Sequence, residues 1–380
     1  MEADREAREQ YVQSARRIVV KVGTNVLAAP GKPLADERVR AIAEQIAWLV
    51  EDGREVVLVS SGAIGCGMTA LGMEQRPTAL PLLQGAASVG QGMLMAHYER
   101  HFRRHGLHAA QILLTREDFD DRDRYLNASN TIHALLDMPC VPVINENDSI
   151  STKEIKFGDN DLLAALVTHL IRAELLVLLS TVPGIYVERP AEDAPGEVLP
   201  LVERVDGETR KLVYDETSPD GLGGMDSKIE AARIASEAGE AAIIADGRDP
   251  EIIPAIFSGQ PVGTLFLPSS ARLRSRKRWI RFTSRPTGAL RIDEGAEKAL
   301  TEGGKSLLPV GVVGVEGEFN RGDVVSVRGA DGREVARGLV NYDSRQIRRI
   351  MGRQTDELEA VLDQVDYDEV IHRDNLALIT

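Results

Sequence analysis

Short runs of apolar residues alternate along the first two thirds of the chain with longer stretches in which apolar residues recur every three or four positions. The short runs are typical of strands buried on both faces, and the longer stretches are typical of amphipathic helices. We therefore predict strands at 17–21, 56–59, 109–114, 141–144, 175–179 and 241–245, and helices at 36–51, 78–104, 122–136, 161–172 and 227–238. This alternation predicts an α/β domain in which helices cover both faces of a largely parallel, open sheet.

The predicted helix at 36–51 has a clear apolar face, and Asp36 stands where it can cap the first turn. Residues 1–15 are mostly polar and predict a loose tail or a short helix.

From about residue 270 the pattern changes to short apolar runs separated by glycines, which is typical of a small, mostly β domain. A basic run at 272–278 precedes this part of the chain. We expect four segments: a tail at 1–15, an α/β domain at 16–270, a basic linker at 271–285, and a small, mostly β domain with a C-terminal tail at 286–380.

The composition is that of an ordinary globular protein, with 380 residues, 43% hydrophobic and 27% charged. No apolar run is long enough for a membrane span, and the charged N-terminus does not resemble a secretory signal. Cys66 and Cys140 are too few for a disulfide framework, so we expect them to pack in the interior of a cytoplasmic protein. The net charge of −14 argues against nonspecific binding of nucleic acid.

Polar motifs follow four of the predicted strands. They are Lys21 with its glycine turn, 60–62, 145–148 and 180–181. Because ligands of parallel α/β sheets bind beyond the carboxyl ends of the strands, these motifs predict one shared site.

Residues 145–161 carry the densest group of polar side chains. Asn145-Glu-Asn-Asp148 directly follows a buried strand, and Phe157-Gly-Asp-Asn-Asp161 precedes a helix. Buried polar groups need partners, and a small, highly charged substrate would provide them. Capping of the helix by Asp159 or Asn160 is the alternative interpretation of the second motif.

Two glycine-containing motifs suit phosphate. Lys21-Val-Gly-Thr-Asn combines a cation with a turn that exposes N–H groups, and Gly221-Leu-Gly-Gly-Met-Asp-Ser-Lys228 leads into a helix. The second motif is not a P-loop of the G-x-x-x-x-G-K-[ST] type. A surface lysine and a surface loop are the alternative interpretations.

Two further patterns do not indicate a site. Residues 65–70 match G-x-G-x-x-A, but the glycines lie too far beyond the strand for a dinucleotide site. His97, His101 and His105 share one helix face, but no carboxylate or cysteine pattern accompanies them, so we predict an exposed helix face and no metal site.

Taken together, the motifs resemble those of the glutamate 5-kinases, a branch of the amino-acid kinase family. The matching segments are 19–24, 60–63, 145–148, 157–161, 223–225 with Lys228, and 262–266. The C-terminal part resembles a PUA domain through the segments 276–280, 307–309 and 372–374.

The resemblance implies ATP-dependent phosphorylation of the side-chain carboxylate of L-glutamate, the first step of proline biosynthesis. A glutamate carboxylate, with a pKa of about 4.3, is already ionised at neutral pH, so the reaction needs no general base. The expected cofactors are ATP and Mg²⁺, with Mg²⁺ held by the phosphates and water rather than by protein ligands. The resemblance also implies inhibition by proline through the loop at 149–156, a homodimer or homotetramer, and transfer of the product to a glutamyl-phosphate reductase.

The resemblance also implies roles for individual residues. Lys21 and Lys228 would stabilise the transferring phosphoryl group, and Asp161 would hold both lysines. N–H groups of Gly23, Gly62 and Gly223 would bind phosphate oxygens. Glutamate would be bound by Ser61, Gly62, Asn145, Asp148 and Asn160, and the nucleotide by Lys21, Gly23, Ser180, Thr181, Leu222, Gly223, Gly224, Met225, Asp226, Ser227 and Lys228.

Thr181 and Leu222 depart from the family pattern, which commonly has an acidic residue and a threonine at these positions. Two other functions stay open at this point. One is a kinase of the same fold that acts on aspartate or N-acetylglutamate, and the other is RNA binding by the C-terminal domain.

Overall fold

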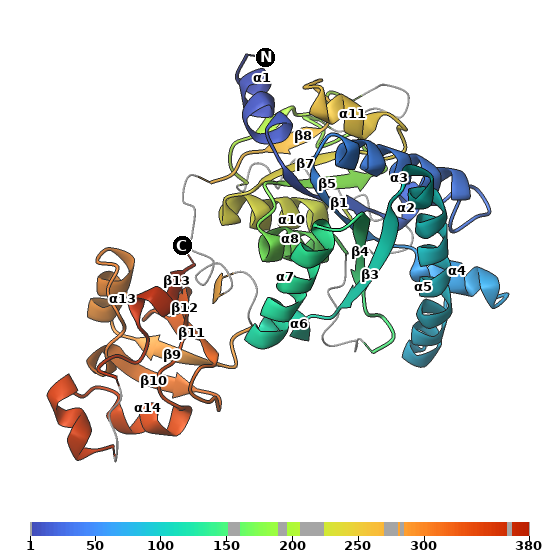
Figure 1. The fold of residues 1–380 in the computed structure, drawn as a ribbon. Helices are drawn as coiled ribbons and strands as arrows, with labels where there is room; N and C mark the ends of the chain where they lie inside the picture. The colour runs from blue at the N-terminus through green and yellow to red at the C-terminus, as the bar shows by residue number, and fades with distance from the viewer. Residues whose placement is uncertain are drawn as a thin grey trace. The chain divides into compact units, whose positions relative to one another are not determined.

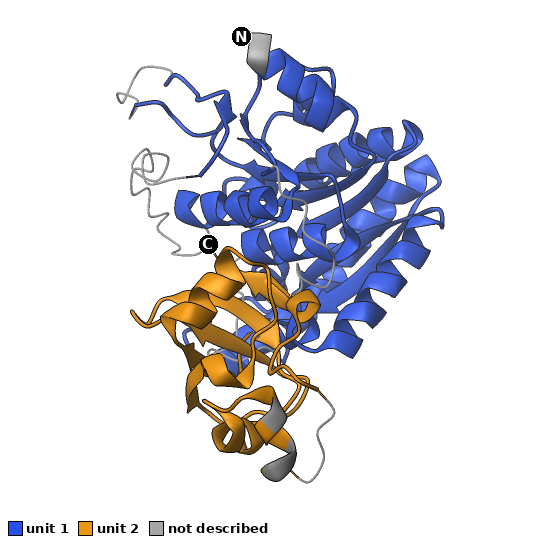
Figure 2. Ribbon diagram, turned by 90° about the vertical axis from the view of Figure 1, so that its left-hand side faces the viewer, with its two compact units in different colours: residues 1–272 blue, residues 273–380 orange. Residues whose placement is uncertain are grey.

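The structure is a computed structural model that describes residues 2–150, 160–188, 196–205, 224–269, 280–281, 285–362 and 367–379. The chain forms two compact units, residues 1–272 and residues 273–380 (Figure 2). The basic run at 272–278 lies outside the described residues.

The described part of unit 1 holds an eight-stranded sheet with the order β3-β4-β2-β1-β5-β7-β8-β6. The strands are β1 (Arg17–Val22), β2 (Glu55–Ser60), β3 (His108–Leu114), β4 (Cys140–Glu146), β5 (Leu175–Ser180), β6 (Leu201–Val202), β7 (Ala241–Asp246) and β8 (Thr264–Phe266). Neighbouring strands from β3 to β7 are parallel, and β8 pairs antiparallel with β7. The predicted largely parallel sheet is confirmed.

Helices cover both faces of this sheet (Figure 1). One group contains α3 (Asp36–Glu51), α5 (Leu80–Phe102) and α11 (Ile252–Phe257), and the other contains α7 (Arg122–Leu136), α8 (Asn160–Ile171) and α10 (Met225–Ala238). The central strands are therefore buried on both sides, and Ile18, Val19 and Val20 of β1 have no exposed surface. This burial explains why the strands are uninterrupted apolar runs rather than alternating patterns. The other α-helices in the described residues of unit 1 are α1 (Glu2–Arg8), α2 (Thr24–Leu27), α4 (Ala63–Ala70) and α6 (Glu117–Asp120).

Helices α4 and α5 cross at very short range. A Cβ atom added to Gly67 would overlap the carbonyl oxygen of Ala86, and one added to Gly90 would overlap the carbonyl oxygen of Ala63. Glycine is unfavourable inside helices, so its presence at both positions is explained by this close approach.

Two predictions about the helices are wrong. Asp36 does not cap α3, because the N-cap is Ala35 and the Asp36 carboxylate instead accepts hydrogen bonds from His97 and His101. The histidine face of α5 is not uniformly exposed, because His101 is only 1% exposed.

Unit 2 has a small sheet and its own apolar core. In the residues that are described, the strand order is β10-β9-β11-β12-β13, for β9 (Gly288–Ile292), β10 (Val312–Glu316), β11 (Val324–Arg328), β12 (Glu334–Leu339) and β13 (Leu376–Leu378). The pairs are antiparallel except for β9 with β11. Helices α13 (Glu294–Thr301) and α14 (Ser344–Ile350) accompany the sheet, which confirms the expected small, mostly β unit. Across the described residues of both units, no helix has the length and apolar character that a membrane crossing requires.

Candidate active site

Strand β1 lies at the centre of the sheet, between β2 and β5, and carries Lys21 close to its carboxyl end. Lys21 pairs with Val59 of β2 and Leu178 of β5, and Val59 pairs in turn with Ile144 of β4. Because all four strands are parallel, Lys21, Ser60, Asn145 and Ser180 are at one edge of the sheet. In the chain, β1 is followed by β2 on one side, whereas β5 lies on its other side, which is the arrangement at which α/β sheets bind ligands.

Lys21, Asp161 and Lys228 form a buried ion-pair cluster. Asp161 Oδ1 lies 2.5 Å from Lys21 Nζ, and Asp161 Oδ2 lies 3.0 Å from Lys228 Nζ. The exposed fractions are 3% for Lys21, 0% for Asp161 and 6% for Lys228. Two cations and one anion leave these three groups with a net positive charge in a place that is poorly solvated, so the cluster suits an anionic ligand.

The two helices that deliver these residues both begin at the cluster. Asp161 is in the first turn of α8, and Lys228 is in the first turn of α10, whose N-cap is Gly224. Ser227 Oγ donates to Asp161 Oδ2 at 3.1 Å or to the carbonyl oxygen of Gly224 at 2.8 Å. The start of α10, where Gly224, Met225, Asp226 and Ser227 lie, offers N–H groups and a helix dipole that favour phosphate. Leu222 and Gly223, which we also expect at the nucleotide, lie outside the described residues.

A second group of polar side chains surrounds the start of α8. Asn160 Nδ2 lies 2.8 Å from Ser61 Oγ, 3.0 Å from the carbonyl oxygen of Ser60 and 3.0 Å from Asn145 Oδ1. Asn145 is 3% exposed, and its Nδ2 donates to Gln91 Oε1 of α5 at 2.9 Å. These bonds engage both ends of the Asn145 amide, so Asn145 supports Asn160, and a direct contact of Asn145 with glutamate stays a prediction.

Gly62 and Gly23, which we expect at the phosphates, differ in backbone conformation and in hydrogen bonding. Gly62 has a φ of 103°, in the left-handed region, and forms the N-cap of α4, so a side chain there would strain the turn after β2. The N–H of Gly23 donates to the carbonyl oxygen of Leu179 at 3.3 Å, and binding of a phosphate oxygen by this N–H stays a prediction. A Cβ atom at Gly23 would lie 3.6 Å from Lys21 Nζ, an ordinary van der Waals contact, so Gly23 is directly beside the Lys21 ammonium group.

The other predicted residues lie at the same edge of the sheet. Ser180 ends β5 and its carbonyl oxygen accepts from the N–H of Gly247 at 2.8 Å, and Thr181 follows it. Asp148 comes two residues after the end of β4 and is half-buried. Residues 151–159, which include most of the predicted proline loop and Asp159, lie outside the described residues.

Sequence reasoning missed two buried side chains next to the site, Gln91 and Tyr98. Both are on the buried face of α5, and Tyr98 Oη lies 2.8 Å from Ser60 Oγ. Burial raises the pKa of the Tyr98 hydroxyl, and it raises the pKa of the Cys66 thiol to about 11. Both groups are therefore neutral at physiological pH, and Cys66 is not an activated nucleophile. The only signal in the sequence was that polar residues stand at positions of the helical repeat where apolar ones are expected.

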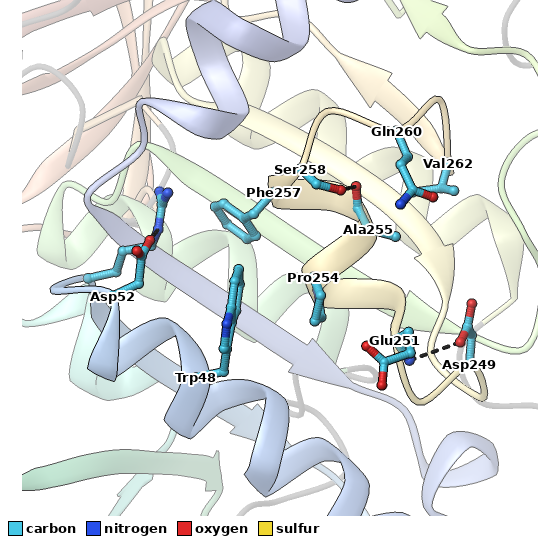
Figure 3. A pocket seen from close by; sticks show the side chains of 11 residues that line it. Trp48, Asp52, Asp249, Glu251, Pro254, Ala255, Phe257, Ser258, Gln260 and Val262 are labelled. Carbon is cyan, nitrogen blue, oxygen red and sulfur yellow. Dashed lines mark hydrogen bonds and ion pairs between the residues drawn. The ribbon is translucent and has the colours of Figure 1, made fainter.

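A groove of about 510 Å³ lies elsewhere on unit 1, beside α3 and α11 (Figure 3). Trp48, Pro254 and Phe257 provide its apolar surface, and Arg54 stacks over the Phe257 ring at 4.5 Å. None of the predicted site residues lines this groove. We therefore place the candidate active site at the ion-pair cluster and not here.

Comparison with known proteins shows the family of this chain. Residues 16–246 match the model of the amino acid kinase family, and residues 288–362 match the PUA domain. The chain is 46% identical over 373 residues to a glutamate 5-kinase of Trichlorobacter lovleyi, covering 98% of this chain and 99% of the relative. It is 48% identical over 370 residues to one of Thioalkalivibrio sulfidiphilus, covering 97% and 99%, and 45% identical over 364 residues to one of Methylococcus capsulatus, covering 96% and 97%.

Proposed function

The chain belongs to the amino acid kinase family, and we propose that it is a glutamate 5-kinase, which uses ATP to phosphorylate the side-chain carboxylate of L-glutamate in the first step of proline biosynthesis. Similarity to glutamate 5-kinases over nearly the whole chain supports this activity. The single structural observation that carries it is the buried cluster of Lys21, Asp161 and Lys228.

The cluster fits the electrostatic problem of this reaction. A carboxylate oxygen of glutamate attacks the γ-phosphorus of ATP, the bond to the oxygen that bridges the β- and γ-phosphorus atoms breaks, and ADP leaves with the electron pair. Both reactants are anions, and the nucleophile is already ionised, so the enzyme must supply positive charge and alignment rather than a base. We propose that Lys21 and Lys228 stabilise the transferring phosphoryl group and that Asp161 positions both ammonium groups.

We propose that the nucleotide phosphates bind at the start of α10. Gly224, Met225, Asp226 and Ser227 form this helix start, and Lys228 follows in the same turn. Ser180 and Thr181, at the end of β5, complete the nucleotide side of the site in this proposal.

Mg²⁺ is proposed as a companion of ATP. Both oxygens of Asp161 face lysine ammonium groups, so this carboxylate does not suit a metal ion. The cation would therefore be held by phosphate oxygens and water, as its octahedral preference allows. Its contribution when bound is to neutralise phosphate charge.

Glutamate is proposed to bind between the ends of β2 and β4 and the start of α8. Ser61 and Asn160 are hydrogen-bonded to each other there, and Gly62 begins α4 beside them. Asp148 supplies the negative charge that suits the α-ammonium group of glutamate.

We further propose that proline competes with glutamate at this site. Ser149, which starts the loop implied in inhibition, is joined to Ser88 of α5 through hydroxyls 2.8 Å apart.

The function is tested by incubating the protein with ATP, Mg²⁺ and hydroxylamine, which traps an acyl phosphate as a hydroxamate. Glutamate, aspartate and N-acetylglutamate are compared, with and without proline. Hydroxamate formation with glutamate is expected, at a rate that proline lowers. Equal or faster turnover of aspartate or N-acetylglutamate would show that the substrate is assigned wrongly, whereas insensitivity to proline would remove only the proposed inhibition. Size-exclusion chromatography with light scattering tests the expected homodimer or homotetramer, and assays with a glutamyl-phosphate reductase test transfer of the product.

A further inference from the structure

The side chain of Gln91 is buried on α5 and is joined to the proposed glutamate site through a chain of amides. Gln91 is 8% exposed, and its Oε1 accepts from Asn145 Nδ2 at 2.9 Å. Asn145 Oδ1 accepts from Asn160 Nδ2 at 3.0 Å, and Asn160 Nδ2 also lies 2.8 Å from Ser61 Oγ. Three amide side chains from α5, β4 and α8 thus end at the serine hydroxyl.

Backbone groups fix the orientation of two of these amides. The N–H of Glu146 donates to Asn145 at 2.9 Å, so the atom it meets must be the oxygen. The carbonyl oxygen of Ser60 accepts from Asn160 at 3.0 Å, so the atom it meets must be the nitrogen. Asn145 Nδ2 consequently faces away from both groups and needs a buried acceptor, which is Gln91 Oε1.

This orientation determines which atoms a ligand meets. Asn160 Oδ1 has no hydrogen-bond partner among the described residues, so it is available as an acceptor, and the Ser61 hydroxyl accepts from Asn160 and keeps its proton for donation. An acceptor beside a donor suits the α-ammonium and α-carboxylate groups of an amino acid.

We propose that Gln91 is a positioning residue of this site. By holding Asn145, it keeps Asn160 in the place from which Oδ1 accepts a hydrogen bond from the α-ammonium group of the substrate. The inference rests on the proposed function, because it takes an α-amino acid as the ligand. Gln91 itself does not contact the reacting atoms and acts only through Asn145.

The chain offers a matched control in Gln45 of α3. Gln45 is also buried, at 5% exposed, and its Oε1 accepts from the N–H of Ile253 at 2.9 Å. Gln91→Met and Gln45→Met each remove one buried amide acceptor while keeping the length of the side chain. Each leaves a buried N–H without its partner, so both variants should lose some thermal stability.

Kinetics distinguish a positioning role from a merely structural one. In Gln91→Met the KM for glutamate is expected to rise roughly tenfold, with the KM for ATP unchanged within about twofold, because only the amide chain is disturbed. Gln45→Met is expected to change neither KM. Gln91→Glu, which retains an acceptor for Asn145, is expected to restore most of the affinity for glutamate.

An analogue that lacks the α-ammonium group gives a second readout. 2-Oxoglutarate is measured as a competitive inhibitor against glutamate, and its inhibition constant is expected to stay the same in Gln91→Met. The KM for glutamate should rise in the same variant, since only glutamate uses Asn160 Oδ1.

Other outcomes overturn the proposal. An unchanged KM for glutamate in Gln91→Met, or equal rises for glutamate and ATP, would show that Gln91 is only a packing residue. If Gln91→Met fails to fold, Gln91→Asn replaces it, because the shorter side chain withdraws the acceptor and stays polar. This variant must then show the raised KM for glutamate and the unchanged KM for ATP. Absence of ADP formation by the unmodified protein with glutamate would instead reject the proposed function itself.

Discussion

Lys21 and Lys228 are far apart in the sequence, yet their ammonium groups meet the two oxygens of one carboxylate, that of Asp161. One lysine comes from the central strand and the other from the first turn of α10. Since all three side chains are almost completely buried, neither lysine can exchange this partner for water. The charge of Asp161 is therefore a condition for this buried cluster and, under the proposed function, for the chemistry as well.

Replacing Asp161 by asparagine is therefore expected to impair stability and turnover together. The substitution preserves shape but removes a buried charge that pairs with two buried ammonium groups, and breaking such a pair costs about 3–5 kcal/mol. Thermal unfolding and ADP formation measure the two effects. Asp246→Asn is the control, because that carboxylate pairs with the exposed Arg248 at 2.6 Å and should cost less than about 1 kcal/mol. An Asp161→Asn variant as stable as the unmodified protein would contradict the cluster.

Lys228→Ala is expected to reduce turnover at least about a hundredfold, because the transferring phosphoryl group loses a few kcal/mol of electrostatic stabilisation. The measurement is the kcat for ADP formation at saturating glutamate and ATP. Arg233→Ala serves as the control on the same helix, since Arg233 pairs with Glu230 and Glu237 of α10 and not with the cluster. Near-normal turnover of Lys228→Ala would remove this lysine from catalysis.

Asp148→Asn is expected to raise the KM for glutamate and leave the KM for ATP unchanged. The half-buried carboxylate is the proposed partner of the substrate ammonium, and the amide keeps its size but not its charge. Steady-state kinetics with each substrate varied in turn make the test. A change confined to the KM for ATP would mean that Asp148 belongs to the nucleotide instead.

The crossing of α4 and α5 predicts opposite effects for two neighbouring glycines. In Gly90→Ala the added methyl group would overlap the carbonyl oxygen of Ala63, so α4 would have to move away from α5. The free energy of unfolding should fall by about 3 kcal/mol or more. Gly92→Ala, two residues further along the same helix, meets no atom within 4 Å and should stabilise the protein by up to about 1 kcal/mol. Chemical denaturation compares the two variants. Equal stability of both would contradict the close approach.

Asp36 predicts a specific sensitivity to acid. Partial burial pushes its pKa upward, but the hydrogen bonds from His101 and His97 outweigh this effect and lower the pKa from 3.8 to about 2. Arg100 adds a further cation, 3.3 Å from the same oxygen. A carboxyl whose pKa is lower in the folded state stabilises the protein above pH 3.8, and this stabilisation is lost as the pH falls towards 2.

The Asp36→Asn variant tests whether the ionised carboxylate stabilises the protein. Its Tm should lie below that of the unmodified protein at pH 7, and the gap should narrow as the pH is lowered from about 5 to about 3. A gap that is constant over this range would show that the carboxylate charge contributes nothing.

Much of the fold could be predicted because buried parallel strands require uninterrupted apolar runs. The predicted strand at 175–179 became Leu175–Ser180, and the predicted helix at 122–136 became Arg122–Leu136. The helix α4 was not predicted, because Gly65 and Gly67 lower its helix propensity, and the need for Gly67 is explained only by the crossing with α5. Asp36 was misjudged for a similar reason. A local capping position could be seen in the sequence, whereas the histidines that bind it come from a distant helix.

The candidate site divides in the same way. The strand-end rule located Lys21, Ser61 and Asn145, because their positions follow from the local pattern. Gln91 and Tyr98 could not be found, because a buried polar residue on a helix becomes meaningful only when its partner on another element is known. The hydrogen bond from the Gly23 N–H to the carbonyl oxygen of Leu179 could not be predicted either, because it depends on the pairing of β1 with β5.

The position of β1 at the middle of the sheet has a consequence for the newly made protein. Lys21 is translated with β1, whereas the helix that carries Lys228 is translated only after the strands β1 to β5 have been made. Until then Asp161 lacks its ion pair with Lys228, and the start of α10, where we propose that phosphate binds, does not exist. Under the proposed function, a chain that ends before α10 therefore cannot transfer a phosphoryl group, because it lacks one of the two proposed lysines.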